Sequence, residues 1–476
     1  MAIKGDVAAK VREAIHQSLA IHPTPGQEQF IQQFSKFAEE SHDGIFILRG
    51  YAGTGKTTLM SAIAKTFTNV VLLAPTGRAA KVLSTYTSRP AFTIHKYLYM
   101  PAMTSNGRMT LRLNENKHVK TLFIVDEASM IPDAAIEDES SHFPGVNLLT
   151  DLINYIYSGI KCRLLLVGDT AQLPPVHFDN SPSLDANHLR YRFRRDVFET
   201  ELTEVVRQEK DSGILLNATA LRILISRNAK EPVLKVTGFK DIQRIDAREM
   251  SDLMHSLYSK YGQDNVLVIT RSNKSAIQYN KMIRFQQLWM EEEIGAGDCL
   301  MVVKNNYFWL PSDHQAGFIA NGDVIEVKRI HRFEEKYGFR FAQATIELKD
   351  YPNEPTFEVN LLLNTLSSES PALTSEENKQ LFDALHTHYA LDEPDQRKRN
   401  ALIKKDAYYN AMQIKFSYAV TCHKSQGGQW PVVFVDQGFL NEEMLGTSYL
   451  RWLYTAFTRA SEQLYLLNFD ERFFKT

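Results

Sequence analysis

The sequence has little of what marks secreted, membrane-spanning or metal-binding proteins. Its only cysteines among 476 residues are Cys162, Cys299 and Cys422, which are too far apart for a metal-ligand motif. So few scattered cysteines fit a reducing compartment. No apolar run approaches the roughly 18 residues that a membrane helix requires, and residues 1–20 contain no signal-peptide core. We therefore expect a soluble protein of the cytoplasm, or of the host cytoplasm if the source is viral.

An excess of charge of either sign is also missing. The 54 Lys and Arg residues nearly balance the 56 Asp and Glu residues, which leaves a net charge of −2. Bulk charge therefore gives no argument for nucleic-acid binding, and any such site must be local. We find no internal repeat of solenoid period and no low-complexity segment. At roughly 100–200 residues per domain, the length suggests about three domains.

The chain does contain a phosphate-binding loop. Residues 50–57 fit the pattern G-x-x-x-x-G-K-[ST], with an apolar run at 45–48 before them and a helical pattern after Thr58. Backbone N–H groups and the helix dipole then face a phosphate, Lys56 reaches the outer phosphates, and Thr57 ligates magnesium. The alternative, a flexible glycine turn, is disfavoured by the Lys-Thr register and the preceding strand. The residues expected to hold ATP here are Gly50, Ala52, Gly53, Thr54, Gly55, Lys56, Thr57 and Thr58.

Four short apolar runs separated by helical segments predict a parallel sheet covered on both faces. They are residues 45–48, 70–73, 122–125 and 164–167. Each run ends in a polar cluster, and ligands of open α/β sheets bind at the carboxyl ends of the strands. The clusters that begin at Gly50, Ala74, Asp126 and Gly168 should therefore form one site.

Two of these clusters carry hydrolytic chemistry. Asp126 can hold magnesium, directly or through water, and Glu127 can polarise the attacking water. The alternative is a solvated acidic turn. Gln172 follows the fourth run and could sense the terminal phosphate or orient the water, although from chemistry alone a plain turn residue is an equal alternative.

A second set of apolar runs predicts a second sheet. These runs are residues 266–269, 416–420, 432–435 and 464–467, and a long insertion at about 290–412 separates the first from the others. The insertion combines β-like segments with a charged, helix-prone stretch at 375–410. A smaller insertion at 96–120 carries Asn106-Gly107, which is a hairpin signal. The polar residues 178–200 are taken as the passage between domains.

Two arginines and a glycine-containing loop are the candidate groups of the second domain. Arg207 or Arg459 could act across a cleft on the transferring phosphoryl group, as arginine fingers do. The alternative for each is a surface salt bridge. Residues 423–428 offer donors for phosphate oxygens of a nucleotide or a nucleic acid, and Gly427 is assigned to the nucleotide. The alternative there is an ordinary loop.

In their order along the chain, these strings resemble the superfamily 1 helicases, in the branch that includes the phage Dda helicase and bacterial RecD. The matching strings are residues 24–27, 50–58, 74–80, 93–95, 126–129, 168–176, 202–207, 423–428 and 454–460. Residues 321–323 also resemble a string in that branch's inserted domain. The resemblance spans about residues 24–467.

The resemblance implies an α/β fold with two RecA-like P-loop domains. The first would span 1–195 with a hairpin insertion at 96–120, and the second 196–289 and 413–476. Residues 290–412 would be an inserted SH3-like β domain with a helical extension. Gln27 would contact adenine, and Arg207 and Arg459 the terminal phosphate. The residues implied to lie along single-stranded DNA are Pro75, Thr76, Thr93, His95, His423 and Ser425.

We therefore expect an ATP-dependent DNA helicase that uses ATP and Mg²⁺. The resemblance implies 5′-to-3′ movement on single-stranded DNA and a hairpin that splits the duplex. Its expected partners are single-stranded and forked DNA, with single-strand binding, replication, repair or recombination proteins; we expect a monomer that does not bind membranes. Alternatives are an ATP-driven translocase or remodeller without unwinding, a nucleotide-gated binding protein without turnover, and an RNA helicase, since backbone contacts do not name the sugar well.

Overall fold

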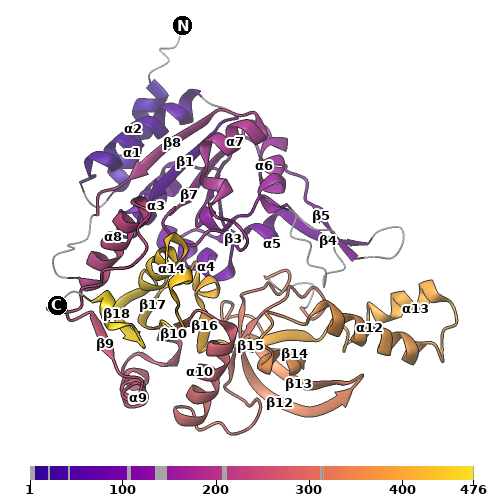
Figure 1. The fold of residues 1–476 in the computed structure, drawn as a ribbon. Coiled ribbons are helices and arrows are strands. Elements are labelled where there is room, and N and C mark those ends of the chain that lie inside the picture. Colours follow the sequence, from indigo (N-terminus) through magenta and orange to yellow (C-terminus); the bar gives the residue numbers. More distant parts are fainter. Residues whose placement is uncertain are drawn as a thin grey trace.

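The computed structural model describes residues 6–19, 22–40, 43–103, 109–134, 147–205, 212–310, 314 and 316–474. Two α/β bodies lie against each other, and a β-barrel with a helical arm lies beside both (Figure 1). Among the helices of these residues, none has the length and apolar character that a membrane crossing requires.

The first body is built on a six-stranded parallel sheet. Its strands run in the order β3-β2-β6-β7-β1-β8. The bounds are β1 Ile45–Gly50, β2 Val70–Ala74, β3 Ala91–Thr93, β6 Leu122–Val125, β7 Arg163–Gly168 and β8 Val197–Leu202. The four apolar runs that predict a parallel sheet are confirmed as its four central strands.

Alternation along each strand divides this body's core into two layers. Phe46 and Leu48 of β1 point to a layer formed with α1 (Asp6–Ser18), α2 (Pro25–Glu40) and α3 (Lys56–Thr66). Ile45 and Ile47 point to the opposite layer, formed with α5 (Ile94–Leu98), α6 (Leu148–Ser158) and α7 (Ala186–Phe193). Because successive side chains of a strand point to opposite faces, an apolar run without alternation requires cover on both sides.

The expected domain boundary after residue 195 is wrong, because β8 belongs to the first sheet. Val197 pairs with Ile45 of β1, and Leu202 pairs with Gly50. Only Val197, Thr200 and Leu202 of this edge strand are buried, so its sequence looks polar and resembles a linker. The first body therefore extends at least to Leu202.

The second body has a five-stranded parallel sheet in the order β16-β10-β17-β18-β9. Its strands are β9 Ile242–Ile245, β10 Val266–Thr270, β16 Ala419–Thr421, β17 Trp430–Asp436 and β18 Ala460–Leu467. Helices α8 (Gly213–Ser226) and α14 (Thr447–Phe457) cover one face. Helices α9 (Met250–Tyr261) and α10 (Asn273–Gln286) cover the other, in a core shared with the barrel.

The expected strand at 416–420 is wrong, because the chain changes sheets within it. Phe416 ends β15 (Met412–Phe416) and pairs with Leu300 in the barrel. Ala419 then begins β16 and pairs with Val268 in the second sheet. One apolar run thus serves two structures, and the expected start of the second domain at 413 lies inside a barrel strand.

The closed barrel contains β11 (Cys299–Val302), β12 (Val324–Lys336), β13 (Phe339–Leu348), β14 (Phe357–Leu362) and β15. Between β14 and β15 lie the short α11 (Asn364–Ser367) and the arm formed by α12 (Ser375–Tyr389) and α13 (Gln396–Ile403). Leu381, Leu385 and Ile403 of the arm pack against Phe339 and Phe341 of the barrel. In Figure 1 the arm extends outward from the barrel.

A two-stranded antiparallel hairpin, β4 (Tyr99–Met103) and β5 (Met109–Leu113), leaves the first body after α5. Its base is anchored, because the Tyr99 hydroxyl donates to Asp151 Oδ2 at 2.7 Å and the Asn114 N–H donates to Leu98 O at 2.7 Å. The expected Asn106-Gly107 turn lies outside the described residues. Figure 1 shows the hairpin extending from the first body toward the side of the helical arm.

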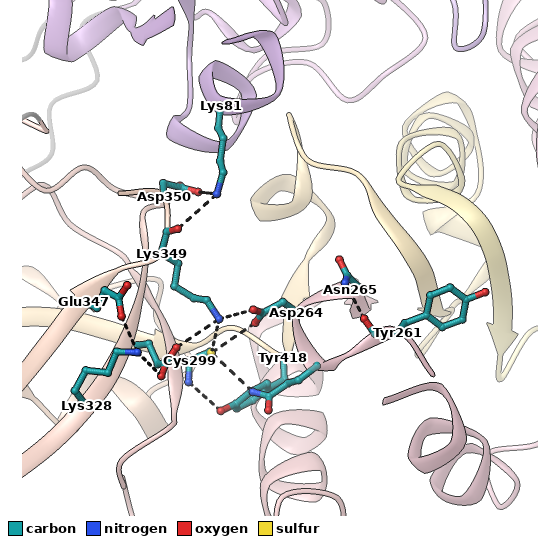
Figure 2. Close-up of polar contacts among 12 residues, drawn as sticks. Lys81, Tyr261, Asp264, Asn265, Cys299, Lys328, Glu347, Lys349, Asp350 and Tyr418 are labelled. Carbon is teal, nitrogen blue, oxygen red and sulfur yellow. Dashed lines mark hydrogen bonds and ion pairs between the residues drawn. The ribbon is translucent and has the colours of Figure 1, made fainter. Parts of the chain in front are cut away.

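Ion pairs fasten the barrel to both bodies. Figure 2 shows Lys81 of α4 (Gly77–Thr87) paired with Asp350, and Lys349 paired with Asp264 just before β10. The N–O distances are 3.1 and 2.5 Å. These residues line a 590 Å³ cavity where the three parts meet. Because each pair is partly exposed, it contributes little stability by itself, so the pairs mainly restrict how the barrel is oriented.

Candidate functional site

The phosphate-binding loop has the backbone that its glycines permit. Gly53 and Gly55 adopt positive φ angles of 78° and 83°, and α3 begins at Lys56 directly after them. These conformations are costly for residues with a side chain and routine for glycine. The loop therefore curves around the N-terminus of α3, where backbone N–H groups and the helix dipole favour an anion.

The side chain of Lys56 folds back onto the start of the phosphate-binding loop. Its ammonium donates to Gly50 O at 2.7 Å and to Tyr51 O at 3.0 Å. The lysine is thus held at the loop by two carbonyl groups. Exchange of these acceptors for phosphate oxygens would bring a full positive charge to the phosphates without a large movement.

Predicted residues from both bodies line one cavity of 480 Å³. They are Ala52, Gly53, Gly55, Lys56, Thr57, Thr58, Asp126, Glu127, Gln172, Gly427 and Arg459. Gly50 and Thr54 do not line it, and Arg207 lies outside the described residues. The cavity therefore gathers three of the four strand-end clusters of the first sheet with three segments of the second body, at residues 214–215, 427–429 and 458–461.

The acidic pair lies in this cavity directly after β6. Burial, with repulsion from Glu127, raises the pKa of Asp126 to about 7, while Lys56 opposes the shift. Glu127 has the left-handed φ of 51°, and its N–H donates to Asp126 Oδ1 at 2.9 Å. Such a conformation costs on the order of 1–3 kcal/mol in a non-glycine residue and is typical of functional sites. The Asp126 carboxylate and the Thr57 hydroxyl supply the hard oxygen ligands that Mg²⁺ prefers.

Gln172 brings an unsatisfied acceptor to the same cavity. The residue is buried, and its Oε1 has no hydrogen-bond partner within the part of the chain that the structure describes. A buried polar atom without a partner is costly, and such groups are usually explained by an ordered water or a ligand. The amide oxygen is therefore suited to accept a hydrogen bond from a water molecule in the cavity.

Arg459 reaches the cavity from the second body and is 3 % exposed. Its guanidinium donates to three acceptors of its own body: Thr455 O through Nε at 3.1 Å, Gly428 O through Nη1 at 3.1 Å, and Thr458 Oγ1 through Nη2 at 3.3 Å. These bonds fix the planar group at the cavity wall. A charge fixed in this way can act on a phosphoryl group only after a short rearrangement.

Gln27 supports the phosphate-binding loop from behind. Its side chain is 1 % exposed and does not line the cavity. Its Nε2 donates to Thr54 O at 2.9 Å, and its Oε1 accepts the Thr24 N–H at 3.0 Å. Both ends of the amide are therefore used within the chain, so its position does not support the expected contact with adenine.

The expected DNA contacts divide into accessible and buried residues. Thr76 is the half-buried N-cap of α4 beside Pro75, His95 is half-buried in α5, and His423 is exposed. Burial lowers the pKa of His95 to about 4, so this ring is neutral at physiological pH.

Two of the expected DNA contacts have their hydroxyls engaged inside the protein. Thr93 is 4 % exposed and caps α5 by accepting the Lys96 N–H at 3.2 Å. Ser425 is fully buried and donates to Cys422 O at 2.8 Å. Their positions do not support a direct contact of either hydroxyl with DNA.

The two expected DNA-binding segments meet at a single loop of the barrel. Lys96, next to His95, pairs with Asp323 at 3.2 Å, and both side chains are buried. Lys424, next to His423, donates to Asn321 Oδ1 at 2.6 Å. Lys424 belongs to the segment 423–428 that the sequence offers as phosphate donors, whereas Lys96 was missed, although its adjacency to His95 was a usable signal. Two cations thus lie at the junction of the three parts.

Two protein-family models match parts of this chain. The family described as an AAA domain matches residues 22–224, and the UvrD-like helicase C-terminal domain matches residues 416–467. The ATP-dependent RecD2 DNA helicase of Deinococcus radiodurans is 26% identical over 88% of this chain and 46% of its own length. The ATP-dependent DNA helicase dda of Enterobacteria phage T4 is 26% identical over 59% of this chain and 60% of its own length.

Among solved structures, the Pif1 helicase from Bacteroides in complex with ADP-AlF3 and ssDNA is 16% identical. The alignment covers 96% of this chain and 95% of that chain, with a TM-score of 0.47. The sequence relationships confirm the resemblance to the superfamily 1 helicases of the Dda and RecD branch. This chain spans about half the length of RecD2 and 60% of that of Dda.

Proposed function

We propose that this chain, a relative of the RecD2 and Dda helicases, is an ATP-dependent DNA helicase whose two α/β bodies are RecA-like domains. The observation that carries the proposal is the 480 Å³ cavity that both bodies line. The first body contributes Lys56, Asp126 and Glu127, and the second contributes Arg459. ATP hydrolysis in a cavity shared by two bodies necessarily couples chemistry to their relative position.

Each catalytic step has a group in place. Lys56 exchanges the Gly50 and Tyr51 carbonyls for phosphate oxygens. Thr57 and Asp126 would hold Mg²⁺, which when bound neutralises charge on the phosphate oxygens. Glu127 accepts a proton from the attacking water, and the free Oε1 of Gln172 accepts a second hydrogen bond from it. Arg459 donates to the transferred phosphoryl group once the cleft closes.

The DNA path is proposed from the segments that flank the cavity. Gly427 connects the two functions, because a Cβ at this position would lie 2.8 Å from Thr76 Oγ1 and the residue also lines the nucleotide cavity. Closure of the cleft would therefore move His423 relative to Thr76. Two DNA contacts, at Thr76 and at His423, that move relative to each other in every ATP cycle can advance the protein along a strand. The direction, 5′ to 3′, rests on the resemblance.

The two insertions complete the proposal. We assign the hairpin β4–β5 as the element that separates the strands, since its base is anchored to the first body by the bond from Tyr99 to Asp151. We assign the barrel as the SH3-like domain, which contacts both DNA-binding segments through Asn321 and Asp323. Forked DNA is the substrate that such an arrangement fits.

The test of catalysis is Glu127→Gln, which keeps the size of the side chain and removes the base. We expect ATP binding to persist and the DNA-stimulated ATPase rate to fall by about 10²–10⁴-fold, the usual contribution of a general base. The control is Glu115→Gln, which changes an exposed glutamate of the same body that lies outside the cavity. Near-normal ATPase of Glu127→Gln would remove this residue as the base and with it the proposed hydrolytic site.

A further inference from the structure

One tyrosine hydroxyl of the second body is bonded directly to the phosphate-binding loop. The Ala52 N–H donates to Tyr454 Oη at 2.8 Å, and the same hydroxyl donates to Asp169 Oδ2 at 2.6 Å. Tyr454 belongs to α14, whereas Ala52 and Asp169 belong to the first body and follow β1 and β7. Tyr454 and Asp169 are each 1 % exposed, so water does not compete for this bridge.

The protons of this bridge have fixed places. The Ala52 N–H can only donate, so it takes a lone pair of Tyr454 Oη, and the single proton of the hydroxyl goes to the carboxylate. Burial raises the pKa of Tyr454 well above its usual value, so the hydroxyl keeps its proton at neutral pH. The other carboxylate oxygen of Asp169 accepts the Ala171 N–H at 2.9 Å.

The same turn of α14 also holds Arg459. The Tyr454 carbonyl accepts the Thr458 N–H at 3.1 Å and the Thr458 hydroxyl at 2.9 Å. Thr458 Oγ1 in turn accepts Arg459 Nη2. A shift of Tyr454 along the helix axis is therefore transmitted to the guanidinium through two hydrogen bonds.

The Ala52 N–H is among the groups that a phosphate would require. Backbone N–H groups of this loop cradle the phosphates of a bound nucleotide, and Ala52 lines the nucleotide cavity. A phosphate oxygen and Tyr454 Oη therefore compete for one donor. An anionic acceptor wins such a competition, because hydrogen bonds to charged groups are about twice as strong as neutral ones.

From this geometry we propose that Tyr454 is a positioning residue that detects the filling of the phosphate-binding loop and, through Thr458, sets the position of Arg459. The proposal rests on the proposed function, since it assigns Arg459 a role in ATP turnover. Before ATP binds, the bridge to Ala52 holds α14 and keeps Arg459 on its own backbone acceptors. When a phosphate takes the Ala52 N–H, α14 is released on that side and Arg459 can move into the cavity.

The test is Tyr454→Phe, with Tyr449→Phe as the matched control. Tyr449 lies on the same helix and is 2 % exposed, but its hydroxyl has no partner among the residues described. We expect Tyr454→Phe to bind ATP about 3- to 10-fold more tightly. The reason is that a phosphate no longer has to displace the Tyr454 hydroxyl from the Ala52 N–H. We expect kcat to fall about 10-fold, because Tyr454→Phe also removes the bond to Asp169, which in the unaltered chain still orients α14 after Ala52 is released. Both values should be unchanged in Tyr449→Phe. A merely structural defect would weaken ATP binding and kcat together, and that result would overturn the proposal.

A double-mutant cycle tests the connection to the arginine. In an Arg459→Ala background, Tyr454→Phe should cause no further loss of kcat, because it acts through the group already removed. Independent, multiplying losses would contradict the connection. If Tyr454→Phe does not fold, Asp169→Asn weakens the same bridge while leaving the ring in place. It should shift both values in the same directions by smaller factors, and unchanged values would equally reject the proposal.

These measurements separate the inference from the proposed function. Equilibrium binding of a fluorescent ATP analogue without DNA needs no helicase activity. If the unaltered chain failed to hydrolyse ATP or to unwind DNA, the proposed function would fail, while the binding comparison of Tyr454→Phe with Tyr449→Phe would still test the competition for Ala52.

Discussion

At the scale of single residues, the site is assembled from groups that are held by their own body. Lys56 is bonded to loop carbonyls, and Arg459 is bonded to carbonyls and a hydroxyl of the second body. N–H groups of both cations are therefore hydrogen-bonded to acceptors within the chain. Each cation must exchange these acceptors for phosphate oxygens before it can act on a nucleotide. Such exchange costs little, since one hydrogen bond replaces another, and it gains the charge of the phosphate.

The variant Arg459→Ala tests the role of the second body in hydrolysis. We expect kcat to fall by about 10³-fold, within the range for arginine fingers, with a much smaller change in ATP affinity. The reason is that the guanidinium acts on charge that develops in the transition state. Steady-state ATPase kinetics on saturating single-stranded DNA give both numbers, and the thermal midpoint checks the loss of the three buried bonds. An equal loss in affinity and none in turnover of bound ATP would instead assign Arg459 to ground-state binding.

Sequence reasoning at this scale worked where chemistry is local. Asp126 and Glu127 follow β6 directly, and Lys56 follows the loop after β1, so their positions follow from the rule that parallel strands end at one edge. It did less well where the outcome depends on distant partners. Ser425 and Thr93 have sequence neighbours that suggest a surface, yet both are buried by packing that no local pattern encodes. The bridge of Tyr454 joins residues about 400 positions apart and has no sequence signal.

At the scale of elements, apolar runs predicted the central strands well and the edges poorly. Central strands of a parallel sheet are apolar on both faces, so their sequences are continuous runs. The edge strand β8 buries three of its six residues and β9 buries one of its four, and neither was expected as a strand. The strands β15 and β16 were merged into one expected strand, because only Ser417 and Tyr418 separate the barrel strand from the strand of the second sheet.

The hairpin β4–β5 is the element on which unwinding should depend. Replacement of residues 103–111 by a short Gly-Ser turn leaves the bond from Tyr99 to Asp151 and the cavity residues intact. We expect ATPase on single-stranded DNA to persist within about twofold, since no residue of the nucleotide cavity is removed. Displacement of the strand from a 5′-tailed duplex should collapse, because a translocating protein then has nothing at the fork.

The two activities are measured on the same preparation, so the ATPase rate is the internal control for folding. Unwinding at the rate of the unaltered chain would exclude this hairpin as the separating element. The next candidate would be the barrel loop that carries Asn321 and Asp323, which contacts both proposed DNA-binding segments.

At the level of the whole molecule, the cleft between the two α/β bodies and the contacts of the barrel have different roles. The cleft between the α/β bodies contains the nucleotide cavity and the Tyr454 bridge. The barrel shares a hydrophobic core with the second body but meets the first mainly through charged pairs, including Lys81–Asp350 and Lys96–Asp323 (Figure 2 shows the first). A shared core is rigid, whereas ion pairs can be exchanged. The barrel should therefore move with the second body when the cleft opens and closes.

Whether this chain unwinds DNA is measured by strand displacement from duplexes with either a 5′ or a 3′ single-stranded tail, in DNA and RNA versions. We expect ATP-dependent displacement from the 5′-tailed DNA duplex. We expect little or no displacement from the 3′-tailed DNA duplex or from the RNA versions. ATP hydrolysis stimulated by single-stranded DNA without displacement from any duplex would contradict this expectation and leave a translocase, and displacement only from the 3′-tailed duplex would reverse the assigned direction.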